Sequence, residues 1–323
     1  MKLIIQIPCL NEEASLPITL GDLPKQINGI DCIETLVIDD GSTDKTVEIA
    51  QQHKVNHIVK LTRNKGLAKA FITGINQALL QGADIIVNTD ADNQYCGADI
   101  PKLIQPILDG KADIVIGNRQ VETIKHFSRL KVFLQKLGSW VVRQVSGTDI
   151  PDATSGFRAY SKEAAIQLNV VSEFTYTLET IISCGRKNLA IRHVPVRTNI
   201  KLRESRLFSS IWGYIKRSMI TIIKIYSMYQ PLKFFTVVGG ISFTLGTAIG
   251  FRYLYYFINK QTAGHIQSLI LAAILLIVGF QIIMMGIAAE LISINRQLLE
   301  DIQIRIKRFE LEKSQKESAH DKK

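Results

Sequence analysis

Short apolar runs alternate with longer amphipathic stretches through the first 120 residues of the chain. The runs are rich in Ile, Leu and Val and are typical of buried strands, while the longer stretches have helical spacing. The expected strands cover residues 3–7, 35–38, 56–59, 85–87 and 113–116, and the expected helices cover residues 12–20, 43–52, 67–80 and 100–108. This alternation predicts an α/β fold, with a Rossmann-like, mostly parallel sheet that has helices on both faces.

The pattern changes after residue 230, where two long stretches carry almost no charge. Residues 234–251 and residues 266–289 contain no charged side chain at all. Each stretch is close to the roughly 20 apolar residues that a membrane-spanning helix needs. Residues 259–265 between them predict a short turn. We therefore expect a transmembrane hairpin at residues 232–292, with its helices at about 232–258 and 266–291.

The segments on either side of this hairpin have their own character. Residues 207–231 mix Trp and Tyr with Lys and Arg, which is typical of helices at the membrane interface, although a polar surface helix is the alternative. Residues 293–323 predict a basic helix followed by a polar tail without regular structure from residue 314. The heptad-like apolar spacing of that helix suits packing against a second subunit, in a homo-oligomer, or against the membrane.

The net charge is +10, from 39 Lys and Arg against 29 Asp and Glu, and the mean hydropathy is +0.13. A basic excess suits either nucleic acid or an anionic membrane surface. Because the apolar residues concentrate in the hairpin, we expect a membrane partner and no nucleic acid. Lys and Arg flank one side of the hairpin, which predicts a multi-pass inner-membrane protein with its N-terminal domain (residues 1–206) and both termini in the cytoplasm. The N-terminus shows no signal peptide, and the four cysteines have no metal-binding spacing.

Polar clusters follow the expected strands of the N-terminal domain at the end of each strand. They cover residues 8–12, 39–44, 63–66, 90–92 and 117–119. Ligands of such sheets bind beyond the carboxyl ends of the strands. Any one cluster could be only a turn or a helix cap, but together they bring several acids and Arg119 to one rim. The chain has neither G-x-G-x-x-G nor the P-loop pattern, which disfavours dinucleotide-binding and P-loop sites.

Asp90 and Asp92 stand one residue apart directly after the strand at 85–87. In an extended backbone, residues i and i+2 point the same way, so both carboxylates can face one point. Hard oxygen ligands of this kind suit Mg²⁺ or Mn²⁺, which in turn favours a bound diphosphate. An acidic turn is the alternative for the triplet taken alone.

These motifs carry a family resemblance over about residues 3–210. Pro8-Cys9-Leu10-Asn11-Glu12 resembles the P-x-Y-N-E start of family 2 glycosyltransferases, and residues 37–46 match their V-x-D-D-G-S-x-D-x-T stretch. Residues 64–70 match N-x-G-x-x-x-A, and Asp90-Ala91-Asp92 is the family's D-A-D. Residues 152–158 are similar to the D-x-x-S-G-F-R segment of the dolichol-phosphate mannosyltransferase branch, the polyprenyl-phosphate glycosyltransferases. Leu10 departs from the usual Tyr, and Asn118 from a frequent Ser.

The resemblance implies a GT-A type fold and an inverting transfer of sugar from a UDP- or GDP-linked donor to a polyprenyl or dolichyl phosphate. The product would be a lipid-linked monosaccharide for cell-envelope glycan or glycoconjugate synthesis. The implied nucleotide-sugar ligands are Pro8, Leu10, Asn11, Glu12, Asp39, Asp40, Lys65, Asp90, Ala91 and Gln94. Asp90 and Asp92 would hold Mg²⁺ or Mn²⁺.

The acceptor in such a reaction needs cationic groups more than a base. A phosphate monoester has a second pKa of about 6 and is largely dianionic at neutral pH, so it can attack the sugar directly. Glu179 is therefore not assigned as a base. The expected catalytic residues are Asp92, Arg119 and Arg158, and the expected acceptor or loop residues are Arg129, Ser155, Arg203, Ser205 and Arg206.

Two other functions compete with this one. A processive polysaccharide synthase of the same superfamily would usually carry Q-x-x-R-W and more spanning helices, and the chain has neither. A silent, membrane-tethered scaffold is the other alternative, and the retained acids Asp40, Asp90 and Asp92 argue against it. A transporter is disfavoured because two helices without buried acids offer no pathway.

Overall fold

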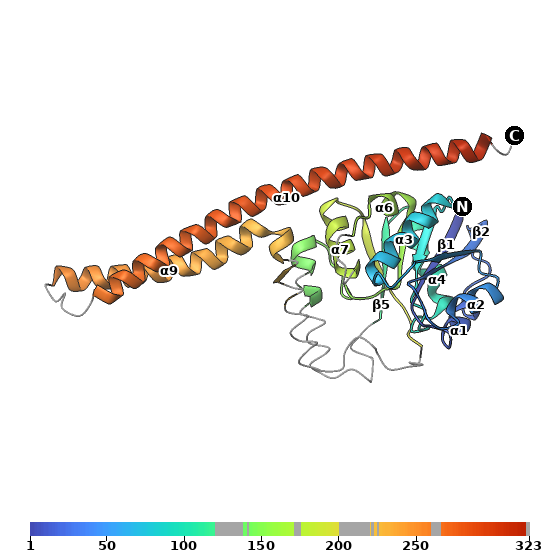
Figure 1. Ribbon diagram of the computed structural model, residues 1–323, viewed down its shortest axis with the longest axis horizontal. Coiled ribbons are helices and arrows are strands. Elements are labelled where there is room, and N and C mark those ends of the chain that lie inside the picture. Colours follow the sequence, from blue (N-terminus) through green and yellow to red (C-terminus); the bar gives the residue numbers. More distant parts are fainter. Residues whose placement is uncertain are drawn as a thin grey trace. The chain divides into compact units, whose positions relative to one another are not determined.

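The computed structural model describes residues 1–119, 138–140, 142–170, 176–199, 220, 223–224, 226–259 and 266–320, with residues 314–320 as backbone only. The chain divides into two units, which are described separately below. The first comprises Met1–Ser218 and Gln303–Lys323, and the second comprises Met219–Ile302. Figure 1 shows the elements of both along the chain.

The first unit is built on a seven-stranded sheet with the strand order β3-β2-β1-β4-β6-β5-β7. Its strands are β1 (Lys2–Cys9), β2 (Cys32–Asp39), β3 (His57–Lys60), β4 (Ile85–Asn88), β5 (Ile114–Asn118), β6 (Arg158–Ser161) and β7 (Ile191–Pro195). Only β6 runs antiparallel to its neighbours, β4 and β5. The predicted mostly parallel sheet is confirmed. The sequence predicted only a turn into a strand edge near residue 158, whereas β6 is an inner strand with buried side chains.

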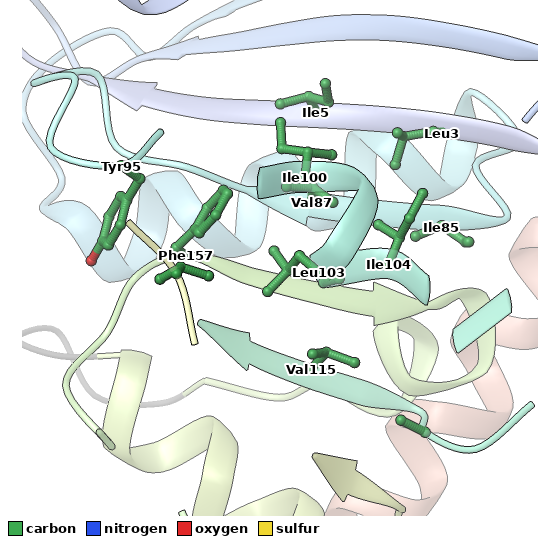
Figure 2. Packing of buried hydrophobic residues seen from close by; sticks show 13 residues of the cluster. Leu3, Ile5, Ile85, Val87, Tyr95, Ile100, Leu103, Ile104, Val115 and Phe157 are labelled. Carbon is green, nitrogen blue, oxygen red and sulfur yellow. The ribbon is translucent and has the colours of Figure 1, made fainter. Parts of the chain in front are cut away.

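Helices cover both faces of this sheet, as predicted. They are α1 (Leu16–Gly21), α2 (Thr46–Gln52), α3 (Leu67–Leu80), a 3₁₀ turn at Gly97–Asp99, α4 (Ile100–Leu108), α6 (Lys162–Gln167) and α7 (Tyr176–Arg186). Leu3 and Ile5 of β1 pack with Ile100 of α4 in the core of one face, as Figure 2 shows. Successive strand residues point to opposite faces. Gln6 therefore points the other way, where its Oε1 lies against Gly74 of α3.

The second unit contains the helix α9 (Pro231–Ile258) and most of the helix α10 (Ile266–His320). Within the described residues, these two helices are long and apolar enough to cross a membrane, with mean hydropathies of 1.6 and 2.7 in their most apolar windows. Their bounds agree closely with the predicted hairpin. The basic helix predicted after residue 292 continues the second hairpin helix without interruption, because α10 runs from Ile266 to His320. For the same reason the expected unstructured tail does not begin at residue 314.

Small residues bring the two hairpin helices into close contact. A Cβ atom added to Gly239 would lie 2.7 Å from the Gly279 carbonyl oxygen and 2.8 Å from the Ile283 side chain. The Ser242 hydroxyl donates to the Leu275 carbonyl across the same interface, at 3.0 Å. Without a hydrophobic force between helices in lipid, such close backbone packing and interhelical hydrogen bonds hold a hairpin together.

We therefore expect Gly239→Val to destabilise the hairpin by about 1–3 kcal/mol, the usual cost of overpacking. Gly240 provides a matched control, because a Cβ atom there meets nothing within 4 Å. Gly240→Val makes the same change in helix propensity and should leave the hairpin in place. Thermal unfolding of both full-length variants in detergent measures the difference. Equal losses of stability would contradict the close packing at Gly239.

The predicted interface helices at residues 207–231 fall almost wholly outside the described residues. Of that segment, the structure describes short helical pieces, including residues 226–229. Tyr229, at the end of the piece at residues 226–229, contacts α10: the guanidinium carbon of Arg296 lies 4.6 Å from the centre of the Tyr229 ring. The apolar stripe of α10 is exposed at Leu299, Ile302, Ile306 and Phe309. The packing partner expected for that stripe stays a prediction.

Candidate active site

The predicted rim forms where the carboxyl ends of the inner strands lie side by side. The parallel register pairs Cys9 of β1 with Asp39 of β2, and Gln6 of β1 with Asn88 of β4. The backbone N–H of Asp40 donates to the Cys9 carbonyl at 2.8 Å, which continues the ladder into the loops. The sequence clusters at residues 8–12, 39–44 and 90–92 therefore leave the sheet at one edge, as their positions after the strands predicted.

The first two loops are joined to each other by side chains. The Asn11 backbone N–H donates to Ser42 Oγ at 2.9 Å, and Asn11 Oδ1 accepts the Thr43 N–H at 2.8 Å. The Glu12 N–H donates to Thr46 Oγ1 at 2.8 Å, while the Glu12 carboxylate accepts the Ser15 hydroxyl at 2.5 Å. Asn11 has a left-handed φ of 55°, a conformation that Asn tolerates better than most residues. These polar residues build the loops and do more than cap a helix.

Asp39 and Asp40 hold the second loop in different ways. Both Asp40 oxygens accept backbone N–H groups, from Lys65 at 2.8 Å and from Gly66 at 2.9 Å. Asp39 Oδ1 accepts the Ser42 N–H at 3.1 Å, and its buried Oδ2 bonds to none of the described residues. Asp40 therefore fixes the turn that carries Lys65.

Gly41 is the residue that lets these loops approach. Its φ is +77°, and a Cβ atom there would lie 2.6 Å from the Arg63 carbonyl carbon. Only glycine adopts this conformation without strain and leaves room for the neighbouring backbone. In the D-D-G motif, the carboxylates of Asp39 and Asp40 thus bind backbone N–H groups of the loops, and Gly41 lets its backbone lie against that of Arg63.

The D-x-D stretch shows the predicted alternation. Asp90, Asp92 and Gln94 are partly exposed, whereas Ala91, Asn93 and Tyr95 between them are buried. The Ala91 carbonyl is held by the Thr19 hydroxyl at 3.0 Å, and Asp92 Oδ1 accepts the Gln94 N–H at 3.1 Å. Asp90, Asp92 and Gln94 therefore each keep part of their surface accessible, in a loop that turns at residues 91 and 92.

The two carboxylates disfavour each other's charge. The pKa of Asp90 is raised to about 7, chiefly by burial and then by the negative charge of Asp92, against the opposing charge of Arg119. A raised carboxyl pKa indicates a site that lacks positive charge. The described residues contain no group of three or more His, Cys, Asp or Glu side chains that could enclose a metal. The pair therefore fits a divalent ion that takes its other oxygen ligands from a bound diphosphate and water.

This raised pKa gives a prediction for the effect of pH on metal binding. A carboxyl group must lose its proton to bind the ion, so we expect Mn²⁺ affinity to fall up to tenfold per pH unit as the pH drops below about 7. Above pH 7 the affinity should be flat. The free energy of unfolding without metal should change in the opposite direction. Because the Asp90 carboxyl binds protons more tightly in the folded than in the unfolded state, stability falls as pH rises from about 4 to 7. Titrations monitored by the EPR signal of free Mn²⁺ at several pH values test the first effect. A pH-independent affinity would contradict the assignment of Asp90.

Arg119 lies at the end of β5 in an ion pair. Its Nε and Nη2 donate to the two oxygens of Asp152 at 2.8 and 2.9 Å, and Nη2 also donates to Thr154 Oγ1 at 2.8 Å. Burial alone would raise the pKa of Asp152, but the hydrogen bonds and charge of Arg119 outweigh it and lower that pKa. Such a bidentate pair fixes the plane of the guanidinium. Its Nη1 makes none of these bonds. Sequence analysis missed Asp152 as the partner of Arg119, although it quoted the motif that contains it.

Arg158 does not have the surroundings expected of a phosphate ligand. Its side chain is fully buried. Its donors bond to the Ser155, Thr177 and Ala153 carbonyls at 2.7, 2.8 and 2.9 Å, and to Thr180 Oγ1 at 2.7 Å. Arg158 therefore ties the loop before β6 to the start of α7, because its donors point into the protein.

Ser155, another residue predicted to contact the acceptor phosphate, is also buried. The Ser155 side chain is fully buried, and its hydroxyl bonds to none of the described residues. It cannot contact a phosphate in this arrangement. Glu179, on α7, is also buried. Arg129, Arg203, Ser205 and Arg206 lie outside the described residues, so their proposed roles stay predictions.

Comparison with known proteins gives a consistent result. A family model described as "Glycosyl transferase family 2" matches residues 4–168. The chain is 33% identical to the UDP-N-acetylglucosamine--dolichyl-phosphate N-acetylglucosaminyltransferase of Methanococcus voltae, over 59% of this chain and 83% of that protein. It is 30% identical to the undecaprenyl-phosphate mannosyltransferase of Micrococcus luteus, over 66% and 90%. It is 31% identical to the dolichol-phosphate mannosyltransferase of Pyrococcus furiosus, over 80% and 73%.

A solved structure supports the fold. The chain resembles glucosyl-3-phosphoglycerate synthase from Mycobacterium tuberculosis, crystallised with Mn²⁺, UDP and glucosyl-3-phosphoglycerate. The TM-score is 0.54, with 18% sequence identity, over 70% of this chain and 79% of that chain. At this identity the likeness concerns the arrangement of the sheet and its helices.

Proposed function

The chain belongs to glycosyl transferase family 2 and has its GT-A type sheet, and from this premise we propose that it moves one sugar from a nucleotide-sugar to a polyprenyl phosphate in the membrane. The observation that carries the proposal is the loop with the partly exposed Asp90, Asp92 and Gln94, in which the charges of Asp92 and Arg119 both act on the Asp90 carboxylate. The names of the relatives, which act on dolichyl or undecaprenyl phosphate, indicate the acceptor class. The product is a lipid-linked monosaccharide.

The donor diphosphate lies against the D-x-D face in this proposal. Asp90 and Asp92 would hold the divalent ion, with Gln94 next to them on the same side. When bound, Mg²⁺ or Mn²⁺ supplies positive charge that stabilises the leaving nucleoside diphosphate. The residues fit such an ion because two hard, partly exposed carboxylates lie close enough in one loop for the charge of Asp92 to raise the pKa of Asp90.

The nucleotide lies against the two joined loops, residues 8–12 and 39–44. Their backbone is fixed by the bonds between Asn11, Ser42 and Thr43. Asp40 binds the backbone N–H groups of Lys65 and Gly66, so the Lys65 side chain is available to bind the donor phosphates. Loops whose backbone is fixed in this way lower the entropy cost of ordering the donor. Both UDP and GDP donors remain compatible with these loops.

The acceptor phosphate attacks the sugar without a protein base. Because it is largely a dianion at neutral pH, it needs cations that hold it in line with the leaving group, and the attack inverts the anomeric carbon. Arg119, oriented by Asp152, is the described cation whose charge lowers the pKa of Asp90 most. Arg129, Arg203, Ser205 and Arg206 are proposed to complete the acceptor site.

The hairpin α9–α10 would keep this chemistry next to the bilayer. A membrane anchor confines enzyme and lipid acceptor to one surface and raises their effective concentration. We propose that both termini and the first unit lie on the cytoplasmic side, where nucleotide-sugars are made.

Release of nucleoside diphosphate tests the reaction class. The full-length protein in detergent is incubated with Mn²⁺ and a panel of UDP- and GDP-sugars, with undecaprenyl or dolichyl phosphate or with the corresponding free alcohol. We expect fast release of one nucleoside diphosphate only when the lipid phosphate is present. Release at the same rate with the free alcohol would overturn the proposed acceptor. No release from any donor would favour a silent scaffold.

A further inference from the structure

A buried group of polar side chains, those of Asn88, Tyr95 and Tyr176, surrounds Gly156 next to the D-x-D loop. At its centre is Gly156, in the loop before β6. A Cβ atom added to Gly156 would lie 3.0 Å from Asp90 Oδ2, 3.1 Å from Asp90 Oδ1 and 3.0 Å from the Tyr176 hydroxyl oxygen. The absence of a side chain at Gly156 therefore lets the Asp90 carboxylate and the Tyr176 hydroxyl approach the same small space.

The Gly156 peptide is fixed on both sides. Its N–H donates to the Tyr95 hydroxyl at 2.9 Å, and its carbonyl accepts the Asn88 side-chain amide at 2.8 Å. The Tyr95 ring stacks on Phe157, with ring centres 5.0 Å apart and an interplanar angle of 14°. The glycine is thus held in place next to Asp90.

Tyr176 is held equally firmly. It is 1% exposed, and its ring stacks on Phe71 of α3 with centres 4.0 Å apart and an interplanar angle of 11°. Its hydroxyl oxygen accepts the Asn88 amide N–H at 3.0 Å. The Asn88 Oδ1 accepts Gln6 Nε2 at 2.8 Å, which fixes the orientation of that amide. Because Asn88 donates to the oxygen, the hydroxyl proton of Tyr176 is left to point elsewhere.

The Tyr176 hydroxyl and the Asp90 carboxylate face the same space beside Gly156, although no hydrogen bond joins them among the described residues. The pKa of Tyr176 is raised well above its usual value, first by burial and then by the negative charge of Asp90. Arg158 bonds to the Thr177 carbonyl and to Thr180 Oγ1, so the first turn of α7 that carries Tyr176 is anchored in the core. The hydroxyl is therefore a fixed, buried dipole beside a carboxylate.

We propose that Tyr176 is a positioning residue of the metal site, whose hydroxyl, oriented by Asn88, fixes the Asp90 carboxylate for metal binding. The inference rests on the proposed function of Asp90 and Asp92. Partners that orient a ligating carboxylate influence metal affinity strongly, and their removal typically costs about 10–100-fold. Tyr176 would thus act on the ion through Asp90, without contact with the substrate.

Binding of Mn²⁺ tests this role apart from catalysis. Tyr176→Phe keeps the ring on Phe71 and removes only the hydroxyl. Tyr160→Phe is the matched control, because Tyr160 is also fully buried and has its ring centre 5.9 Å from that of Phe71, while its hydroxyl lies next to Arg158 and Thr180. Free Mn²⁺ is measured by EPR with the full-length proteins in detergent, with Mn²⁺ alone and with UDP or GDP added.

We expect Tyr176→Phe to weaken Mn²⁺ binding about 10–100-fold, and Tyr160→Phe to bind like the wild type. In turnover assays, the Mn²⁺ concentration for half-maximal rate should rise in Tyr176→Phe, while the rate at saturating Mn²⁺ changes less. Equal Mn²⁺ affinity in the wild type and Tyr176→Phe would overturn the inference and leave the proposed function intact. A wild-type protein that binds no Mn²⁺ in any of the titrations would overturn the metal site and the inference together.

A second variant covers the case in which Tyr176→Phe does not fold. Gly156→Ala keeps the Tyr176 hydroxyl but adds a methyl group 3.0 Å from both that hydroxyl and the Asp90 carboxylate. We expect it to weaken Mn²⁺ binding at least as much, because it separates the two groups. Wild-type affinity in a folded Gly156→Ala protein would contradict the cluster's control of Asp90.

Discussion

Asp92→Asn should abolish formation of the lipid-linked sugar, with a loss of roughly a thousandfold or more in turnover, the scale seen when transition-state charge loses its stabilising group. Asn keeps the size of the side chain and can still accept the Gln94 N–H that Asp92 Oδ1 accepts. It removes one of the two negative charges that face the proposed ion. The diphosphate would then leave without full charge compensation.

The fold should survive this change, because Asp92 is partly exposed and its one described hydrogen bond is local. Asp109→Asn is a suitable control, since Asp109 is a loop aspartate at the end of α4, bonded only to the nearby Gln105 and Lys111. Product formation is measured with each protein recovered from membranes in equal amount. Wild-type turnover of Asp92→Asn with Mn²⁺ present would remove Asp92 from the metal site.

Arg158→Leu should have the largest effect on stability, a loss of about 3–5 kcal/mol in the free energy of unfolding. The substitution leaves the carbonyls of Ala153, Ser155 and Thr177 without their buried donor. Each unsatisfied buried polar group costs about 1–3 kcal/mol. The loop before β6 and the first turn of α7 would then lose their connection. Gly156, in that loop, and Tyr176, in that turn, would move apart as well.

Arg197→Leu is the matched control for Arg158→Leu. Arg197 also pairs with protein oxygens, those of Asp99, but its side chain is 68% exposed. Asp99 is only 9% exposed, but it keeps the hydrogen bond from the Arg197 backbone N–H at 2.7 Å, so the loss should be smaller than for Arg158→Leu. Thermal unfolding of the full-length variants in detergent compares the two. If the two substitutions lowered the unfolding temperature equally, Arg158 would not have the structural role described here.

The sequence predicted the features that depend on local spacing. Apolar runs located the strands of the sheet, and polar clusters after them located the rim, because parallel strands end at one edge. The shared face of Asp90 and Asp92 followed from the two-residue period of extended chain. The hairpin bounds followed from charge-free length. In each case the signal lies within about 20 consecutive residues, which is the range that a periodic pattern covers.

The misplaced features depend on contacts between distant residues. Arg158 was expected to face a phosphate because the implied reaction needs cations that position the acceptor dianion, and nothing in its own segment shows that it bonds to Thr177 and Thr180. The expected helices at residues 12–20 and 43–52 begin later, at Leu16 and Thr46. The first residue of each expected helix instead bonds to the other loop, Glu12 to Thr46 Oγ1 and Thr43 to Asn11 Oδ1, across 34 and 32 positions.

Tyr176 shows the same limit most clearly. It bonds to Asn88 across 88 positions of the chain, and its stacking partner Phe71 belongs to a third element. The sequence marks it only as one aromatic residue in the stretch before Glu179. Its place beside Asp90 follows from the insertion of β6 between β4 and β5, a topology that the sequence did not predict.

The mass of the lipid product tests the central claim most directly. The full-length protein is placed in liposomes that contain undecaprenyl or dolichyl phosphate, supplied with Mn²⁺ and the donor that releases nucleoside diphosphate, and the lipids are extracted and weighed by mass spectrometry. We predict a lipid phosphate heavier by one sugar residue, and none when the free alcohol replaces the lipid phosphate. A ladder of added sugars would indicate a processive synthase, and nucleoside diphosphate release without any sugar on the lipid would contradict transfer to a polyprenyl phosphate.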